Sequence, residues 1–224
     1  MSTIRHFIDE SIRSTELDEF LAKELDRAGY GGVEATKTPL GARVIIYAAK
    51  PGVVIGRRGT NVRELTRILE EKFNLSNPRI AVSEVEVSEL NPAIMASRIA
   101  DALQRGIHFR RIGFWALNRI MRAGAMGVEI ILKGKLRGRR HRYEKYIDGY
   151  IPRSGDPALK NTKTAVTSVK LKQGVLGVKV KIVPPDASFP DKVSIKPAVQ
   201  KVGEVDETES EANPETQDNE GAEE

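Results

Sequence analysis

Two glycines that enclose two arginines lie between two predicted helices in the first half of the chain. The loop is Gly56-Arg57-Arg58-Gly59. A short apolar helix is predicted before it at 51–55, and a longer amphipathic helix directly after it. Branched apolar runs predict strands on either side, at 43–49 and 80–87. The order strand, helix, glycine loop, helix, strand indicates a small α+β unit with the loop at the junction of its two helices.

Glycine spacing by itself is weak evidence for a binding loop. The chain has 19 glycines among 224 residues, so one or two Gly-x-x-Gly pairs are expected by chance, and the sequence contains four. The pairs at 29–32, 124–127 and 174–177 are expected to end helices or to form turns. Only the pair at 56–59 joins two helices and encloses two arginines. Position and paired charge therefore mark it as the candidate site.

The residue types of this loop suit phosphate binding. Glycines let a nucleic-acid backbone approach closely, and free N–H groups at the start of the next helix point toward phosphate oxygens. Arg57 and Arg58 add mobile charge, and Arg63 lies one turn into the following helix. The alternative is a tight turn between helices whose arginines are simply solvated. The predicted contacts to nucleic acid in this region are Gly56, Arg57, Arg58, Gly59 and Arg63.

The charge distribution also predicts a polyanionic partner. The formal net charge of the whole chain is +5, but residues 203–224 contain ten acids and no Lys or Arg. Without this tail, 36 basic residues face 21 acids, which gives a net charge of +15. A folded part this basic is expected to bind polyanions by neutralising phosphates and releasing counterions. Simple solubility is the alternative.

The densest positive charge lies in the second half of the chain. Between residues 105 and 145, twelve basic residues stand against two acids, Glu129 and Glu144. Six of the basic residues alternate with small or aromatic residues across a predicted turn, which suits a ribbon that follows phosphates. A solvated loop is the alternative. The six candidate RNA-binding residues are Lys133, Lys135, Arg137, Arg139, Arg140 and Arg142.

A helix predicted at 109–123 has one basic side and one apolar side. Arg111 and Arg119 fall on the same side as Trp115, whereas the aliphatic residues fall on the other. Trp115 is expected to pack in the core or against a protein rather than to stack on a base.

The remaining elements follow from apolar periodicity and turn residues. A helix is predicted at 15–28, with Thr15 as its cap and Gly29 at its end. The other predictions are a strand at 33–37, a turn at 39–41, a cap by Thr60 or Asn61 for the helix after the glycine loop, a bulge near Ser83 or Glu84, a helix from Asn91-Pro92 to about Gly106, a strand at 128–133, and a hairpin of strands near 165–171 and 178–182 with its turn at 172–174.

Several motifs resemble known families. Val54-Ile55-Gly56-Arg57-Arg58-Gly59 resembles the signature of the KH domain, an RNA-binding module whose glycine loop clamps about four nucleotides. A helix and a strand before this core resemble the type II arrangement. Gly134-Lys135-Leu136-Arg137-Gly138, Ser154-Gly155-Asp156-Pro157 and residues 173–182 resemble the C-terminal domain of the ribosomal protein S3 family, in its archaeal and eukaryotic branch. The similarity covers roughly residues 4–183.

The resemblance implies a structural constituent of the small ribosomal subunit in the cytoplasm. It implies binding of small-subunit (16S-type) rRNA in the head, contacts with neighbouring head proteins, and a position beside the channel through which mRNA enters. In the family, arginines that match Arg110 and Arg111 are associated with this mRNA, and Phe114 stands where bacterial relatives have a lysine. The alternative is a free KH-type regulator or ribosome assembly factor that binds RNA transiently.

These observations together predict an α+β chain that has two folded domains. The first is a type II KH domain, and the second is an α+β domain with an antiparallel sheet, followed by a disordered acidic tail. The predicted bounds are 1–16 for an N-terminal extension, 17–88 for the KH domain, 89–108 for a connecting helix, 109–184 for the C-terminal domain, 185–202 for an extension and 203–224 for the tail.

No pattern in the sequence indicates catalysis. A phosphate-binding P-loop at Gly134-Lys135 would need glycine where Glu129 stands and Ser or Thr where Leu136 stands. The three histidines lack the spacing of metal ligands, and the chain has no cysteine. Its apolar runs are too short to span a membrane. We therefore expect no enzyme activity, cofactor, metal, small-molecule substrate or membrane contact.

Overall fold

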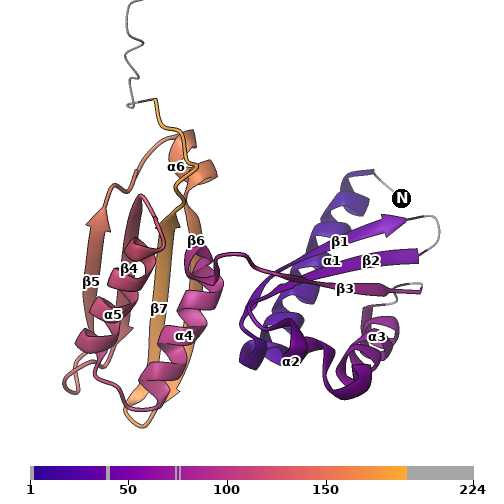
Figure 1. Ribbon diagram of the computed structural model, residues 1–224, viewed down its shortest axis with the longest axis horizontal. Coiled ribbons are helices and arrows are strands. Elements are labelled where there is room, and N and C mark those ends of the chain that lie inside the picture. Colours follow the sequence, from indigo (N-terminus) through magenta and orange to yellow (C-terminus); the bar gives the residue numbers. More distant parts are fainter. Residues whose placement is uncertain (1–2, 39–40, 74, 76, 191–224) are drawn as a thin grey trace, which may run out of the picture. The chain divides into compact units, whose positions relative to one another are not determined.

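The computed structural model describes residues 3–38, 41–73, 75 and 77–190 (Figure 1). Most of the predicted turn at 39–41, most of the predicted extension at 185–202 and the whole acidic tail at 203–224 lie outside these residues. These expectations remain predictions, as do the domain bounds.

The first half of the chain folds into three helices and a three-stranded sheet. Its elements are α1 (Thr3–Glu24), β1 (Tyr30–Thr38), β2 (Gly41–Ala48), α2 (Pro51–Ile55), α3 (Thr60–Phe73) and β3 (Arg79–Glu84). The strand order is β1-β2-β3, in which β1 is antiparallel and β3 parallel to β2. The chain order helix, strand, strand, helix, helix, strand confirms the predicted type II arrangement.

Alternation along β2 places every second side chain in the first core. Val44 and Ile46 are fully buried there, and so are Leu21 of α1, Val54 of α2 and Leu69 of α3. Burying side chains of this size stabilises the fold by roughly 1.5–3 kcal/mol each. Because α2 and α3 are both anchored in this core, the loop between them has fixed ends.

The second half of the chain folds into a four-stranded antiparallel sheet with helices. Its elements are α4 (Pro92–Gln104), α5 (Phe109–Arg122), β4 (Gly127–Gly134), β5 (Arg142–Gly149), α6 (Asp156–Asn161), β6 (Lys163–Leu171) and β7 (Gly174–Val183). The strand order is β5-β4-β7-β6. The helices α4 and α5 lie on the same face of this sheet (Figure 1).

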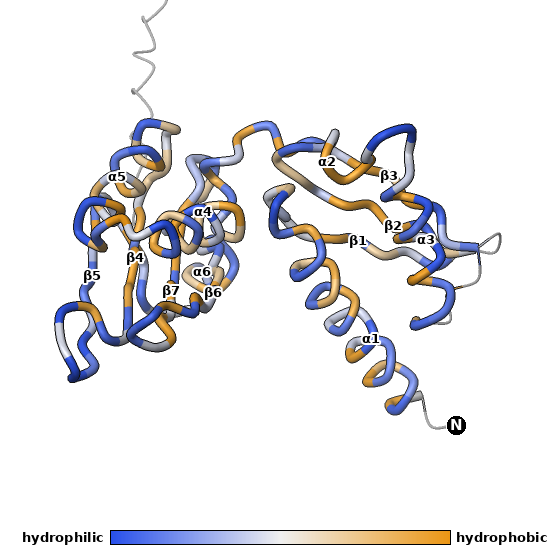
Figure 2. Tube along the Cα trace, turned by 90° about the horizontal axis from the view of Figure 1, so that it is seen from below, coloured by the Kyte–Doolittle hydropathy of each residue, from blue (hydrophilic) through white to orange (hydrophobic). Residues whose placement is uncertain are grey.

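The second core lies between this sheet and its two helices. Ile99 of α4 and Ile120 of α5 are fully buried with Ile130 of β4 and Val180 of β7. Figure 2 shows that β4 is mostly hydrophobic whereas β5 is mostly hydrophilic, as its place at the sheet edge allows. α5 approaches β5 closely at Gly113, where a Cβ would lie 2.6 Å from the ring of Tyr146.

Several predicted elements are confirmed. α2 has the predicted bounds, and α4 and α5 differ from prediction only at their ends. Asn91 caps α4, since its side-chain oxygen accepts a hydrogen bond of 3.0 Å from the amide of Ala93. In the hairpin of β6 and β7 the side chains point to the predicted sides of the sheet. Ala165 lies opposite Val180 on one side, and Lys179 and Lys181 lie on the other.

The predicted start of the first helix is wrong. α1 begins at Thr3, and the hydroxyl of Thr15 donates a hydrogen bond of 2.9 Å to the carbonyl of Ser11 inside the helix instead of capping it. The helix ends at Glu24 and is followed by a short 3₁₀ turn. This turn ends at Gly29, as predicted, because Gly29 has a φ of 72° that favours glycine.

The predictions for β3 and β5 also need correction. β3 pairs with β2 in a regular parallel register from Arg79 to Glu84 and ends there, so the change of apolar phase marks the end of the strand and not a bulge. Neither β5 nor α6 was predicted. Tyr146 is the one buried residue of β5, so this strand lacks the apolar alternation that would have indicated it.

Candidate nucleic-acid interface

The glycine loop (residues 56–59) has a backbone that favours glycine at both ends. Gly56 and Gly59 have φ of 71° and 75°, and Arg58 joins them in the left-handed region with a φ of 54°. Gly56 is required for a second reason, because a Cβ there would lie 2.5 Å from Cγ of Asn61. A Cβ at Gly59 would meet no atom within 4 Å, so a nucleic-acid backbone can approach the loop at this end.

Thr60 and Asn61 hold the loop in place, but they do not cap α3 as predicted. They are the first two residues of the helix. The side-chain amide of Asn61 donates a hydrogen bond of 3.0 Å to the backbone carbonyl of Val53 in α2, and the hydroxyl of Thr60 donates one of 3.0 Å to the backbone carbonyl of Arg57. These bonds fix the loop backbone before any ligand binds, which lowers the ordering cost of binding.

The loop arginines project from this fixed backbone into solvent. Arg57, Arg58 and Arg63 are exposed, and none of them forms an ion pair with another residue in the described part of the chain. By contrast, Arg67 one turn further along α3 binds Glu71 at 2.8 Å. The left-handed backbone of Arg58 costs about 1–2 kcal/mol for a residue other than glycine. The loop thus presents uncompensated positive charge beside the start of a helix.

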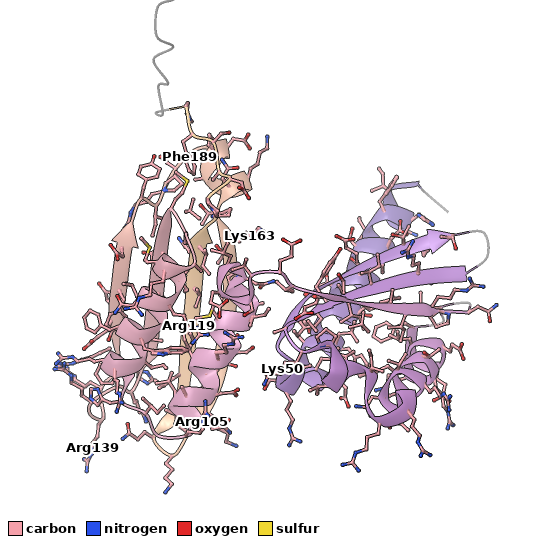
Figure 3. All side chains as sticks on the ribbon, in the orientation of Figure 1. Lys50, Arg105, Arg119, Arg139, Lys163 and Phe189 are labelled. Carbon is pink, nitrogen blue, oxygen red and sulfur yellow. The ribbon has the colours of Figure 1, made fainter. Side chains whose placement is uncertain are left out.

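The basic turn (residues 133–142) joins β4 to β5 at one end of the second sheet. Gly134 pairs with Arg142, so residues 135–141 form the connection. Figure 3 shows Arg139 at this end of the sheet. Of the six predicted RNA-binding residues here, Lys135 is half-buried, while the exposed ones are Lys133, Arg137, Arg139, Arg140 and Arg142.

Glu144 brings together two of the predicted arginines from different elements. Its carboxylate lies 3.3 Å from Arg137 of the basic turn and 3.7 Å from Arg110 of α5. The hydroxyl of Tyr146 donates a hydrogen bond of 3.1 Å to the same carboxylate, and burial together with this bond raises the pKa of Tyr146 to about 12. The guanidinium of Arg137 also lies over the ring of Phe109. Arg110 and Arg137 are therefore held in place, but their charge is shared with an internal acid.

Arg111, the sequence neighbour of Arg110, has different surroundings. It lines a pocket of about 580 Å³ together with Trp115 and with Arg105, which directly follows α4, and no ion pair to Arg111 is formed within the described residues. The two neighbouring arginines thus differ in their surroundings, since Arg110 has a carboxylate partner whereas Arg111 lines a pocket. Phe114 is 58% exposed and packs edge-on against Tyr146.

Trp115 and Arg119 of α5 have structural partners. Trp115 is 41% exposed, so it does not lie in the core, and the alternative that it packs against a protein stays a prediction. The guanidinium of Arg119 lies over its ring. Arg119 binds Glu89 at 3.0 Å, and Arg98 of α4 binds the same carboxylate at 3.2 Å. Burial alone would raise the pKa of Glu89, but hydrogen bonds from its backbone and from both arginines outweigh it and lower the pKa. Glu89 therefore ties α4 to α5.

The residues that sequence reasoning missed here are acids. Glu89 and Glu144 each hold two arginines, and only the long-range packing of helices and strands brings these partners together. For Glu144 the one local signal was that it is one of two acids between residues 105 and 145, and Glu89 lies outside this stretch. No cluster of three His, Asp or Glu side chains that could hold a metal ion occurs among the described residues. Likewise, no helix in the described part of the chain is long and apolar enough to cross a membrane.

Comparisons with known proteins match both halves of the chain. Residues 16–90 match the KH domain family, and residues 99–182 match the family described as "Ribosomal protein S3, C-terminal domain". Proteins named small ribosomal subunit protein uS3 are similar over most of the chain. The one from Methanobrevibacter smithii is 49% identical over 91% of this chain and 81% of its own length. The one from Methanothermobacter thermautotrophicus is 52% identical over 84% and 73%, respectively.

Proposed function

The chain belongs to the uS3 family of structural proteins of the small ribosomal subunit, and we propose that it binds small-subunit rRNA in the head and borders the channel through which mRNA enters. The family is one of structural proteins and not of enzymes. The finer proposal rests on the arrangement of basic residues in the two halves of the chain. A cytoplasmic location and contacts with neighbouring head proteins belong to the same proposal.

The glycine loop is the observation that carries the proposal. Arg57 and Arg58 are exposed and lack a carboxylate partner among the described residues, on a backbone that hydrogen bonds already fix. Next to them, the first turn of α3 offers backbone N–H groups to an anion. Such contacts neutralise phosphates and set register without reading bases. The loop, together with Arg63, is thus suited to clamp an rRNA backbone.

The basic turn supports the same proposal from the second half of the chain. Arg139, Arg140 and Arg142 are exposed and form no ion pair with any described residue. Arg137 has Glu144 as an internal partner, so it orients the turn more than it adds free charge. We assign a larger share of the rRNA affinity to this turn than to the glycine loop. Together with Lys133 and Lys135, the turn has five cations without an ion pair to a described residue, whereas the loop and Arg63 have three.

Arg111 is the stronger candidate for contact with incoming mRNA. Arg110 shares its charge with Glu144, whereas Arg111 is exposed beside a pocket with basic walls. Phe114 adds no charge one turn later, so this helix is expected to grip mRNA more weakly than a relative with a lysine at that position.

Charge reversal in the glycine loop tests the proposal. The variant R57D/R58D of the full chain should bind a transcript of small-subunit head rRNA at least tenfold more weakly, since two phosphate contacts become repulsive. Its melting temperature should stay nearly unchanged, because both side chains are exposed and unpaired. The charge-matched control K23D/R67D alters exposed residues of α1 and α3 outside the loop and should bind almost normally. Equal affinity of the two variants would remove the clamp assignment.

Sedimentation separates the structural constituent from the alternative of a free KH-type regulator or assembly factor. A ribosomal constituent should remain with the small subunit through washing at high salt, whereas a transiently bound regulator should be stripped by counterion competition. Family membership favours the first outcome.

A further inference from the structure

One face of the second sheet carries no helix formed by the described residues. The interstrand register places rows of side chains on this face, opposite to α4 and α5. The first three rows cross the strands in the order β5, β4, β7, β6, and the fourth crosses β7 and β6 alone. The rows are Ile147, Glu129, Lys181 and Thr164, then Lys145, Ile131, Lys179 and Val166, then Tyr143, Lys133, Gly177 and Ser168, and finally Val175 and Lys170 of β7 and β6.

The surface formed by these rows, the lysine face, is strongly basic. Among the described strand residues it carries one acid, Glu129, because the alternation of β5 turns Glu144 and Asp148 to the other side of the sheet. Only one of the lysines, Lys133, was expected to bind RNA. The lysines of the face are Lys133, Lys145, Lys170, Lys179 and Lys181.

Glu129 is buried beneath three cations, which are two lysines of this face and an arginine of the segment between β5 and α6. Its side chain is 4% exposed, and its carboxylate lies 2.5 Å from Lys145, 3.3 Å from Lys181 and 3.9 Å from Arg153. Burial would raise the pKa of Glu129, but the hydrogen bonds from Lys145 and Lys181 outweigh it and lower the pKa. One carboxylate cannot neutralise three cations, so it fixes two ammonium groups in the sheet while leaving the surface positive.

The greater part of the lysine face is open to solvent. Val166 and Val175 are 68% and 59% exposed, and Tyr143 and Ile147 are 68% and 44% exposed. Only one end of the face is covered by other described residues, where Val183 packs with Ala187, Phe189 and Ile151. The described residues of the chain therefore leave the lysine rows uncovered.

We propose that the lysine face binds the phosphate backbone of a double-helical RNA segment. This inference rests on the proposed function and adds a surface to it. Lysines act as point charges that suit phosphates and carry no base recognition. With rows about 7 Å apart and strands about 4.8 Å apart, the lysines are spread over a flat area that no single strand would cover. Single-stranded RNA is bound by stacking on aromatic rings, and Tyr143 at the edge is the one ring among the strand residues of this face.

Three lysines of this face that form no ion pair with a described residue provide the test. The face variant K133Q/K170Q/K179Q leaves the Glu129 cluster intact and removes three positive charges. The control K160Q/K163Q/R122Q removes the same charge from α6, from the start of β6 on the helix side, and from the end of α5. Both variants are made in the full chain and compared by thermal melting. The probes are a short RNA hairpin and a single-stranded RNA with the same number of phosphates.

The expected result is a decrease of about tenfold or more in the affinity of the face variant for the hairpin at low ionic strength, with a salt slope reduced by about 2–3 units, while the control changes little. Equal hairpin binding by face variant and control would overturn the proposal. A decrease confined to the single-stranded probe would overturn the double-helical assignment. If the face variant binds RNA with unchanged affinity but fails to enter small subunits, the lysine face binds a protein, and this result would also overturn the proposal.

The proposed function has a separate readout. If the unsubstituted chain neither binds head rRNA nor remains with washed small subunits, the proposed function fails whatever the face variant does. If the unsubstituted chain binds, the R57D/R58D variant weakens binding and the face variant matches its control, only the inference about the lysine face fails.

Discussion

Glu129 makes a sharp prediction about how the second sheet is held together. The substitution Glu129→Gln keeps the size and the burial of the side chain but removes the negative charge beneath Lys145, Lys181 and Arg153. The amide of glutamine also turns two hydrogens toward groups that only donate. The remaining carbonyl oxygen can still accept a hydrogen bond from one lysine, so the variant loses one charge-assisted hydrogen bond and weakens the other without opening a cavity.

The expected cost follows from the exposure of the partners. A hydrogen bond to a charged group contributes roughly 1.5–3 kcal/mol when both partners are fixed. Here Lys145 and Lys181 are 28% and 31% exposed, so they can turn toward water and recover part of this free energy. We expect Glu129→Gln to lower the free energy of unfolding by about 2–3 kcal/mol, which corresponds to roughly 5–10 °C in melting temperature for a chain of this size. Glu71→Gln, which removes an exposed pair on α3, should cost at most about 0.5 kcal/mol.

Denaturant unfolding followed by the fluorescence of Trp115, the one tryptophan, measures this effect in the second half of the chain. The pH dependence adds a check on its cause. Because the pKa of Glu129 is lowered below its ordinary 4.5 in the folded chain, its contribution is present above that pH and is lost as the pH falls through the folded value. The difference between the unsubstituted chain and Glu129→Gln should shrink in acid. A cost no larger than that of Glu71→Gln, or a difference that stays constant in acid, would refute the reasoning.

Two further predictions concern the glycine loop and the basic turn. Gly56→Ala should lower the free energy of unfolding by about 1–3 kcal/mol, because it adds strain at a φ of 71° and a clash with Asn61. Thermal unfolding measures this effect, and an unchanged melting temperature would mean that the loop relaxes freely. Replacing the three unpaired arginines of the basic turn with Asp should reduce rRNA affinity and the salt slope more than R57D/R58D does. The salt slope should fall by about 0.7–0.9 units for each phosphate that is no longer neutralised. A smaller effect than that of R57D/R58D would contradict the larger share of affinity assigned to the turn. The three arginines are Arg139, Arg140 and Arg142.

The glycine loop was predictable from sequence because its determinants are local. A proline-started helix, two glycines and the next amphipathic helix are read within a short stretch of chain, and α2 and α3 follow that pattern. The same local logic misplaced the start of α1. Ile4, Phe7, Ile8 and Ile12 repeat at helical spacing, yet they are 49–68% exposed, so no core-facing stripe in a compact domain accounts for them.

The ionic partners were not predictable, because they depend on register. Glu129 meets Lys181 only because β4 and β7 pair antiparallel with these residues opposite each other, and a shift by one residue would turn Glu129 into the second core. β5 escaped prediction for a related reason. As an edge strand it has one buried residue among eight, so its sequence looks like a charged loop.

The pairing of Arg110 with Glu144 has a kinetic consequence. A phosphate that binds Arg110 must displace the carboxylate or share the guanidinium with it, so one ionic contact is exchanged for another and little free energy is gained. The return of Glu144 then helps to release the phosphate. On the proposed path of the mRNA, this gives a weak contact that breaks readily, which suits a strand that must keep moving past the protein.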